Sequence, residues 1–429
     1  MFKGAARADR VTDQPDQPDQ PEWAADRPER AAVRAPVGDR RVHALVLPPG
    51  PRLYDALAAA LDGGGPAVCP ISPDLPAPAR DALLDALAPH AVETEDGVEP
   101  RRPRSACAPI AGIPADPGTA VMIGTSGSTG SPKIVELSAA ALRHSAAATL
   151  DRIGAGPGDR WLCCVPTSHI AGVQVLVRSL VAGTAPIIHP RFDARAAAAA
   201  DADHVSVVPT QLRRLLDAGA DLSRYRSILL GGAAAPPDLL DEARARGGRV
   251  FTTYGMSETC GGCAYDGIPL DGVRADVDAA GRVRLAGPVL FTGYRLRPAA
   301  TAAVRDGDWY LTQDLGAVED GRLRIRGRID DVINTGGEKV VAGEVAAALS
   351  RHPKIRDVVV VGRADPDWGE RVSAVVVPAS AAEPPALREL RAFVRATMPA
   401  HAAPHELDLV EAIPLLPSGK PDRTLLRQG

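Results

Sequence analysis

The chain has 429 residues, a formal net charge of −4 at pH 7, and an aromatic content of only 3%. A chain of this length exceeds one ordinary hydrophobic core, which predicts two or more domains and excludes a small scaffold held by disulfides. Acidic and basic residues are mixed throughout, and the scarcity of aromatic residues argues against a nucleic-acid surface built from basic patches and stacking platforms.

The first segment, residues 1–38, is expected to be a disordered tail. It contains DQPDQPDQP and many charges, with few large apolar residues, and such a composition cannot bury enough apolar surface to order a chain. No apolar stretch of the kind found in a secretory signal follows its basic residues. Six cysteines in a chain this long set no disulfide framework, so a cytoplasmic, reducing location is the simplest expectation.

From Val42 onward, short apolar runs alternate with stretches rich in Ala, Leu and Arg. The runs HALVLP, HVSVVPT and RSILLGG are typical of buried strands, whereas RLYDALAAALDG is typical of a helix. This rhythm predicts a large α/β domain with several subdomains over residues 39–328. The longest apolar run, residues 170–188, contains Arg178, two glycines and a proline, so no membrane-spanning helix is expected.

The character of the sequence changes near Arg328. Two apolar runs, DVVVVGR and VSAVVVP, accompany two helical stretches, EVAAALSRH and LRELRAFVRATMP. These elements predict a small α+β domain over residues 329–429, able to fold as a separate unit.

The strongest local motif is GTSGSTGSPK, residues 124–133, which follows the apolar segment TAVMIG and precedes helical sequence. Glycines let the backbone approach an anion closely, and the hydroxyl groups offer donors to phosphate oxygens. A flexible linker rich in Ser and Gly is the alternative interpretation, and the absence of GxxxxGK[ST] excludes a Walker loop. The predicted phosphate-binding residues are Thr125, Ser126, Gly127, Ser128, Thr129, Gly130 and Lys133.

Lysine is rare, with only five residues in the chain, whereas arginine is abundant. A retained lysine therefore suggests a site that needs a compact, flexible ammonium group. Lys133, Lys339 and Lys420 lie near glycines and are expected in loops, while Lys3 and Lys354 are interpreted as surface charges.

Two further stretches carry candidate site residues. In TTYGMSETCGG, residues 252–262, Tyr254 offers a flat face for a base and Glu258 a carboxylate for Mg²⁺; a turn with a packed tyrosine is the alternative. In WYLTQDLGAVEDGRLRIRGRIDD, Asp314 is placed at the end of an apolar run, where it can accept hydrogen bonds from two ribose hydroxyls, and Arg328 can reach the same nucleotide. The CxxC motif within TCGGC has no second pair at zinc spacing, which disfavours a metal site there.

Together, TSGSTGSPK, YGMSET, LTQDLG, GRIDDVINTGGEKV and PSGKPDR resemble, in this order, the motifs of adenylate-forming acyl-CoA synthetases. The resemblance covers the chain from about Ala120 to its end. It implies an enzyme that uses ATP, Mg²⁺ and CoA, with a small mobile C-terminal domain.

The resemblance also implies a role for each matching residue. Thr125 to Lys133 would hold the β- and γ-phosphates, and Tyr254 would pack on adenine. Glu258 would hold Mg²⁺, Thr259 would touch the α-phosphate, and Asp314 with Arg328 would bind ribose. The adenine-binding segment beside Tyr254 would be Gly231, Gly232 and Ala233.

The C-terminal domain of this family swings about a hinge residue that matches Asp330. One orientation would bring Lys420 to the adenylation reaction, and the other would present Gly336 and Gly337 to the pantetheine arm of CoA. Ala342 and Gly343 stand where many relatives have a proline before the acid that matches Glu344.

The acid substrate is expected to bind near residues 165–183, VPTSHIAGVQVLVRSLVAG. His169 matches a position where the family places a residue that gates the acid pocket; a buried structural histidine is the alternative. Arg178 shares a helix face with Gln174 and Ala171, and a charge on this otherwise apolar helix needs a partner or exposure. It is either paired with an acid of the protein or available for a second carboxylate on the substrate.

VPTQLRRLL, LLGGAAAPP and YGMSETCGGCAYDG resemble segments of the o-succinylbenzoate–CoA ligases of menaquinone biosynthesis. This favours o-succinylbenzoate as the acid, with another aryl or acyl acid, including one loaded onto a carrier protein, as the alternative. A nucleotide-binding regulator without catalysis is the non-enzyme alternative, which Lys420 and Glu258 disfavour. No nucleic acid and no stable membrane insertion are expected, and a homo-oligomer stays open.

Overall fold

The computed structural model of the protein describes residues 40–101, 111–125, 132–416 and 421–428. Contacts divide the chain into residues 1–35 and residues 36–429, and the first of these units lies outside the described ranges. Within the described ranges, no helix combines the length and apolar character that crossing a membrane would require.

The first sheet has seven strands in the order β16-β6-β5-β2-β1-β3-β4. β1 pairs in parallel with β2 and β3, and β2 pairs in parallel with β5. Buried apolar strands such as AVCPI are expected in parallel pairs, because helices connect them and cover the sheet. The strands are β1 Val42–Val46, β2 Ala67–Ile71, β3 Ala91–Thr94, β4 Gly97–Pro100, β5 Thr119–Thr125, β6 Lys133–Ser138 and β16 Gly293–Tyr294, with helices α1 Pro51–Leu61 and α2 Ala77–Leu87.

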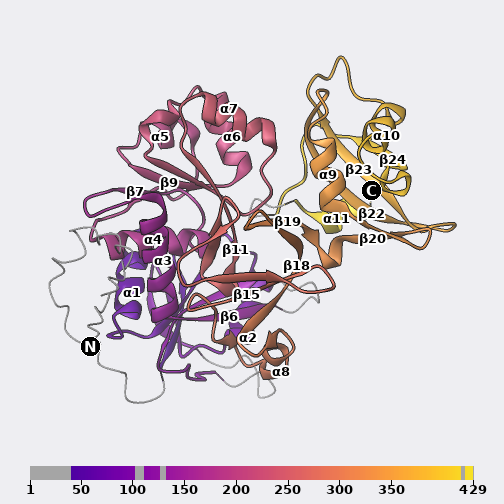
Figure 1. Cartoon of the computed structure of the whole chain (residues 1–429). Helices are drawn as coiled ribbons and strands as arrows, with labels where there is room; N and C mark the ends of the chain where they lie inside the picture. Colours follow the sequence, from indigo (N-terminus) through magenta and orange to yellow (C-terminus); the bar gives the residue numbers. More distant parts are fainter. Residues whose placement is uncertain (1–39, 102–110, 126–131, 417–420, 429) are drawn as a thin grey trace, which may run out of the picture. The chain divides into compact units, whose positions relative to one another are not determined.

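The second sheet also has seven strands, in the order β13-β12-β11-β10-β9-β7-β8. Figure 1 shows its strands β7, β9 and β11. Its strands β7 to β11 are parallel, and β12 returns antiparallel to β11. The strands are β7 Trp161–Cys163, β8 Ile187–Ile188, β9 His204–Val207, β10 Ser227–Leu230, β11 Val250–Met256, β12 Gly261–Tyr265 and β13 Ile268–Pro269. The helices of this part are α3 Ala139–Ile153, α4 Ile170–Ala182, α5 Ala194–Ala199, α6 Pro209–Asp217 and α7 Pro237–Ala245, with the 3₁₀ turns η2 Leu222–Arg224 and η3 Ser257–Thr259.

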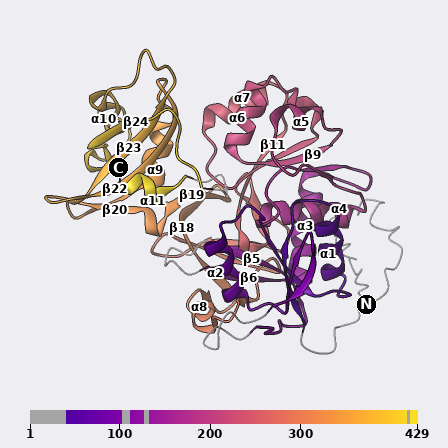
Figure 2. The same cartoon turned by 180° about the vertical axis from the view of Figure 1, so that it is seen from behind.

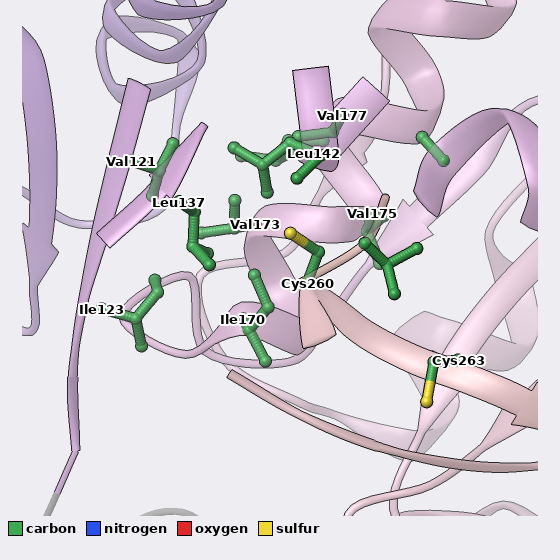
Figure 3. Packing of buried hydrophobic residues seen from close by; sticks show 14 of the residues in the cluster. Val121, Ile123, Leu137, Leu142, Ile170, Val173, Val175, Val177, Cys260 and Cys263 are labelled. Atoms are coloured by element: carbon green, nitrogen blue, oxygen red, sulfur yellow. The ribbon is translucent and has the colours of Figure 1, made fainter. Parts of the chain in front are cut away.

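One apolar core joins these two sheets through α3 and α4. Val121 and Ile123 of β5 pack in the same cluster as Val173 of α4 and Cys260 at the start of β12 (Figure 3). Cys260 and Cys263 are fully buried in it, and burial raises the pKa of the Cys263 thiol to about 12. The two cysteines are therefore neutral packing residues, and the described residues contain no group of three or more His, Cys, Asp or Glu that could hold a metal.

A third, antiparallel sheet follows, in the order β14-β15-β18-β17, with β19 paired to β18. Its elements are β14 Arg274–Val277, β15 Arg282–Ala286, β17 Arg305–Asp306, β18 Trp309–Glu319 and β19 Arg322–Arg328, with helix α8 Pro298–Ala302. Asp314, which ends an apolar run in the sequence, lies inside β18.

The C-terminal part forms a fourth sheet in the order β21-β20-β23-β22, with β24 paired to β23. Figure 2 shows β20, β22, β23 and β24 of this sheet together with α9 and α10. It has a core of its own, in which Val345 and Leu349 of α9 pack with Leu390 of α10. Its elements are η4 Ile329–Asp331, β20 Val332–Thr335, β21 Glu338–Val341, α9 Ala342–Leu349, β22 Ile355–Asp365, β23 Gly369–Pro378, α10 Leu387–Arg395, η5 Ala400–Ala402, β24 Glu406–Leu409 and α11 Arg423–Gln428.

The structure confirms the α/β fold class with a large N-terminal part and a smaller α+β C-terminal part. The two strands and two helices predicted at the C-terminal end correspond to β22, β23, α9 and α10. The expectation that rare lysines lie in loops is wrong for two of them, since Lys133 begins β6 and Lys339 lies in β21. Both lysines lie next to stretches of sequence rich in glycine, where sequence patterns separate strand from loop poorly.

Arg295, which directly follows β16 and is only 3% exposed, connects this strand to α2 and β6. Its guanidinium donates to the carbonyl oxygen of Leu87 at 2.6 Å and to Glu136 at 3.1 Å. Removing one partner of a buried pair leaves the other charge uncompensated.

We therefore expect Arg295→Met to lower the free energy of unfolding by about 3 to 5 kcal/mol, measured by urea denaturation. The matched control is Arg191→Met, because Arg191 forms an ion pair of 3.4 Å with Asp74 in which the two side chains are 85% and 76% exposed. Exposed pairs contribute little. Equal urea midpoints for the two variants would contradict this interpretation.

Candidate active site

Three residues predicted to bind the nucleotide meet where β11, β18 and β19 lie together. The hydroxyl of Tyr254 donates a hydrogen bond of 2.7 Å to Oδ2 of Asp314. Arg328 stands directly opposite Asp314 in the β18–β19 pair, and its Nη1 lies 3.4 Å from Oδ1. Burial, followed by the nearby Asp314 carboxylate, raises the pKa of Tyr254 well above its usual range, so the phenol stays a hydrogen-bond donor.

The same arginine also holds the predicted hinge residue. Nε and Nη2 of Arg328 contact the two carboxylate oxygens of Asp330 at 2.8 and 3.0 Å. Burial acts to raise the pKa of Asp330, but the Arg328 guanidinium outweighs this effect and holds the pKa below its ordinary value. Such a fork-shaped pair is among the stronger hydrogen-bonded arrangements available to side chains.

Glu258 lies in η3 and is connected to the predicted phosphate loop through Tyr294. The Tyr294 hydroxyl donates to Oε1 of Glu258 at 2.8 Å, and Nζ of Lys133 lies 5.3 Å from the centroid of the Tyr294 ring. Lys133 and Glu258 therefore lie on the same tyrosine. The ammonium group could contact a phosphate, and the carboxylate could hold the metal ion bound to that phosphate.

Tyr294 was not predicted from the sequence. It lies in the two-residue strand β16, too short to produce a periodic pattern, and packs at 5.0 Å from Phe291. Phe291 in turn contacts Tyr310, with 5.3 Å between ring centroids. Three of the chain's few aromatic residues, Phe291, Tyr294 and Tyr310, thus form a cluster beside Glu258. The composition of the sequence does not indicate this cluster.

Thr125 and Lys133 pair directly across the ends of β5 and β6. The hydroxyl of Thr125 donates to the carbonyl oxygen of Lys133 at 3.1 Å. These two residues thus border the predicted phosphate loop. Ser126, Gly127, Ser128, Thr129 and Gly130, as well as Lys420, lie outside the described residues.

Two other residues predicted at the nucleotide site, Thr259 and Gly231, are tightly packed. The Thr259 side chain is fully buried, and its hydroxyl donates to the carbonyl oxygen of Gly261 at 2.7 Å. A Cβ atom on Gly231 would lie 2.3 Å from Oγ1 of Thr253, so only glycine fits there. This close approach places the segment from Gly231 through Gly232 to Ala233 beside the residue that precedes Tyr254.

Gly336 and Gly337 form the two-residue turn between β20 and β21. Both have positive φ angles, of 58° and 84°, as a type I′ turn requires. A Cβ atom on Gly336 would also lie 2.5 Å from the Trp368 ring. The turn itself is therefore a physical reason for the paired glycines.

His169 and Arg178 both belong to α4. His169 is the residue just before the first turn and is half-buried. Arg178 is 5% exposed, donates to Oγ of Ser206 at 3.2 Å, and stacks on Trp161 with 4.9 Å from its guanidinium carbon to the ring. In the described part of the chain, no acid forms a salt bridge with Arg178 and its buried Nε has no hydrogen-bond partner.

Comparison with known proteins covers both parts of the chain. The family model described as AMP-binding enzyme matches residues 66–328, and the model of the AMP-binding enzyme C-terminal domain matches residues 344–420. A relative from Mycobacterium tuberculosis, named as a probable 2-succinylbenzoate–CoA ligase, is 44% identical over 326 residues, which cover 72% of this chain and 84% of the relative.

Two solved structures share the fold. The amide bond synthetase McbA from Marinactinospora thermotolerans has a TM-score of 0.80 at 26% identity, covering 92% of this chain and 91% of its own. The o-succinylbenzoate–CoA synthetase from Bacillus subtilis, in complex with its acyl-adenylate, has a TM-score of 0.76 at 25% identity, covering 90% of this chain and 88% of its own. The chain therefore belongs to the family of AMP-binding enzymes.

Proposed function

We propose that the chain activates 2-succinylbenzoate with ATP and transfers the acyl group to CoA, giving the thioester, AMP and pyrophosphate. The 44% identity to the probable ligase from Mycobacterium tuberculosis supports the reaction. The observation that carries the choice of acid is Arg178, a buried cation without an acidic partner in the described part of the chain. A buried, unpaired charge is costly, and an anionic substrate removes that cost.

The two steps follow from the chemistry of a carboxylate. At neutral pH its leaving group would be oxide, so it does not react with a thiol. Attack of the carboxylate oxygen on the α-phosphorus of ATP forms an acyl-AMP anhydride and releases pyrophosphate. The thiolate of CoA then attacks the acyl carbon, and AMP leaves with the electron pair of the broken bond.

The described residues supply the nucleotide part of this mechanism. Asp314 would accept hydrogen bonds from ribose, with Tyr254 and Arg328 fixing the direction of its carboxylate. Tyr254 would also pack on adenine next to Gly231. Lys133, with Thr125 and the loop that follows it, would neutralise the β- and γ-phosphates.

Mg²⁺ fits the residues around Glu258. This ion is commonly held by one or two carboxylates together with substrate phosphates and water, and Glu258 presents one carboxylate oriented by Tyr294. When bound, the ion would neutralise charge that develops on the phosphates. Lys420 would add a mobile positive charge at the α-phosphate in the same half-reaction.

The domain division belongs to the proposal. Residues 39–328 would form the adenylate-forming domain, and residues 329–429 the mobile domain with its hinge at Asp330, held here by Arg328. Gly336 and Gly337 would border the path of the pantetheine arm. A cytoplasmic location, suited to ATP and CoA as co-substrates, completes the proposal.

A second candidate keeps adenylation but changes the acid or the acceptor. The fold match to the amide bond synthetase McbA favours this candidate, because an amine can displace AMP from the same anhydride. Loading of another aryl or acyl acid onto a carrier protein belongs to the same class of reaction.

An acid panel tests the choice of substrate, with pyrophosphate release and thioester formation as readouts. We expect 2-succinylbenzoate to exceed benzoate in kcat/KM by roughly 10- to 100-fold, the value of one charge-assisted contact in a buried site. Arg178→Met is expected to remove this advantage through KM while leaving benzoate unchanged. Equal losses for both acids would show that Arg178 only supports the fold.

Lys420→Ala tests the division into half-reactions. We expect adenylate formation to fall by about 100- to 1,000-fold, as when one transition-state donor is removed, while thioester formation from preformed acyl-AMP is retained. The matched control is Lys354→Ala, because Lys354 forms an ion pair of 3.1 Å with Glu389 in the C-terminal part. The assignment is wrong if Lys420→Ala impairs only the thioester step.

Glu258 and Tyr294 can be tested by Mg²⁺ titration at saturating ATP. We expect Tyr294→Phe to raise the Mg²⁺ concentration for half-maximal adenylation by about tenfold. The reason is that the variant removes the hydroxyl that orients the proposed metal-binding carboxylate of Glu258. Glu258→Gln should raise it further. Glu319→Gln is the control, since Glu319 pairs with Arg324 at 2.8 Å in an exposed position; an unchanged midpoint in Glu258→Gln would exclude the proposed metal contact.

A further inference from the structure

The contacts that hold Arg178 come from neutral side chains. Its guanidinium carbon lies 4.9 Å from the Trp161 ring, and its Nη1 donates to Oγ of Ser206 at 3.2 Å. Trp161 is fully buried in β7, and Ser206 is 8% exposed in β9. A cation over an indole face is attracted by the ring without losing its net charge.

One acidic residue, Asp159, does lie in this region, but its carboxylate contacts Arg226 and His204. Asp159 forms an ion pair with Arg226, and its Oδ2 lies 3.1 Å from Nε2 of His204. His204 also bonds to Ser227 at 2.8 Å and packs on Trp161 at 4.8 Å between ring centroids. Burial lowers the pKa of His204, so the imidazole at neutral pH adds no second positive charge beside Arg178.

We propose that Trp161 and Ser206 are positioning residues that hold the Arg178 guanidinium in place without neutralising it. Its charge then stays available for the carboxylate of 2-succinylbenzoate that is not activated. This inference rests on the proposed function and explains how the protein keeps a buried cation oriented for a substrate.

The physical alternative is an ordinary ion pair. If an acid of the protein held Arg178, each substrate carboxylate would have to displace it, and the gain in binding would be the small difference between two similar contacts. Neutral contacts avoid this competition. They leave the free protein with an uncompensated charge, a cost that the anionic substrate removes on binding.

The decisive variant is therefore Ser206→Asp, which puts a carboxylate beside Arg178 in place of the hydroxyl that now lies 3.2 Å from its Nη1. We expect KM for 2-succinylbenzoate to rise by roughly tenfold or more, because the new acid takes a charge-assisted contact from the substrate. The free energy of unfolding should stay equal or increase, since the buried cation gains a partner. Ser206→Asn is the matched control, being similar in size without the charge.

Trp161 is tested by Trp161→Phe and Trp161→Leu. We expect KM for 2-succinylbenzoate to rise modestly in the first and by about tenfold in the second, as the aromatic face is reduced and then lost. The rate constant kcat and the kinetics with benzoate should change little. Trp309→Leu is the control, because Trp309 lies under Arg274 and Arg284 at 4.9 and 4.7 Å, away from Arg178 in the third sheet.

The outcomes separate the two levels of the proposal. If wild-type protein converts benzoate as efficiently as 2-succinylbenzoate, the proposed substrate is wrong and the inference falls with it. If wild-type protein prefers 2-succinylbenzoate but Ser206→Asp and Ser206→Asn have equal KM values, the proposed function stands and the inference is overturned. A rise in KM confined to Ser206→Asp, with undiminished stability, supports it.

Discussion

The register between β18 and β19 is the constraint on which the proposed nucleotide-binding cluster depends. It places Asp314 opposite Arg328, and a slip by one residue would turn one of the two side chains to the other face. An irregularity between Leu315 and Gly316 sets this register. A Cβ atom on Gly316 would lie 2.6 Å from the carbonyl oxygen of Arg324, so the bulge beside Asp314 accepts only glycine.

The proposed acid-binding residues depend on a different constraint, the close packing at the start of α4. A Cβ atom on Gly172 would lie 2.4 Å from the carbonyl oxygen of Pro166. Because glycine has no side chain, the first turn of the helix can pack directly against the segment that follows β7. One turn later the fully buried Gln174 begins a polar strip, and Arg178 continues it over Trp161. The helix thereby carries a charge into a region that is otherwise apolar.

The fold class and the motifs could be predicted from the sequence because they depend on local patterns. Apolar runs identified the strands around Leu45, Ile228 and Val359. The contacts that complete the site join residues far apart in the chain. Tyr294 lies 36 positions from Glu258, and Ser206 lies 28 positions from Arg178, so no window of sequence contains either pair.

Burial also explains which residues of the site were missed. Trp161 and Ser206 are common residues of a core strand, and only the guanidinium beside them gives them a role. Asp314 and Arg328, in contrast, are charged residues in a strand pair. Burying a charge costs free energy, so their presence there suggests a functional role. A sequence thus reveals the charged members of a site more readily than the neutral residues that hold them.

Arg328 belongs to two clusters at once, since its guanidinium contacts Asp314 at 3.4 Å and Asp330 at 2.8 Å. Behind it, Arg427 of α11 donates to the main-chain oxygen of Asp330 and to the carboxylate of Asp331, both at 3.0 Å. Any backbone rotation at Asp330 must therefore break or rearrange these contacts. Removal of Arg328 would disturb both Asp314, the proposed ribose-binding acid, and Asp330, the proposed hinge. The shared arginine would thus physically link nucleotide binding at Asp314 to rotation at the proposed hinge, Asp330.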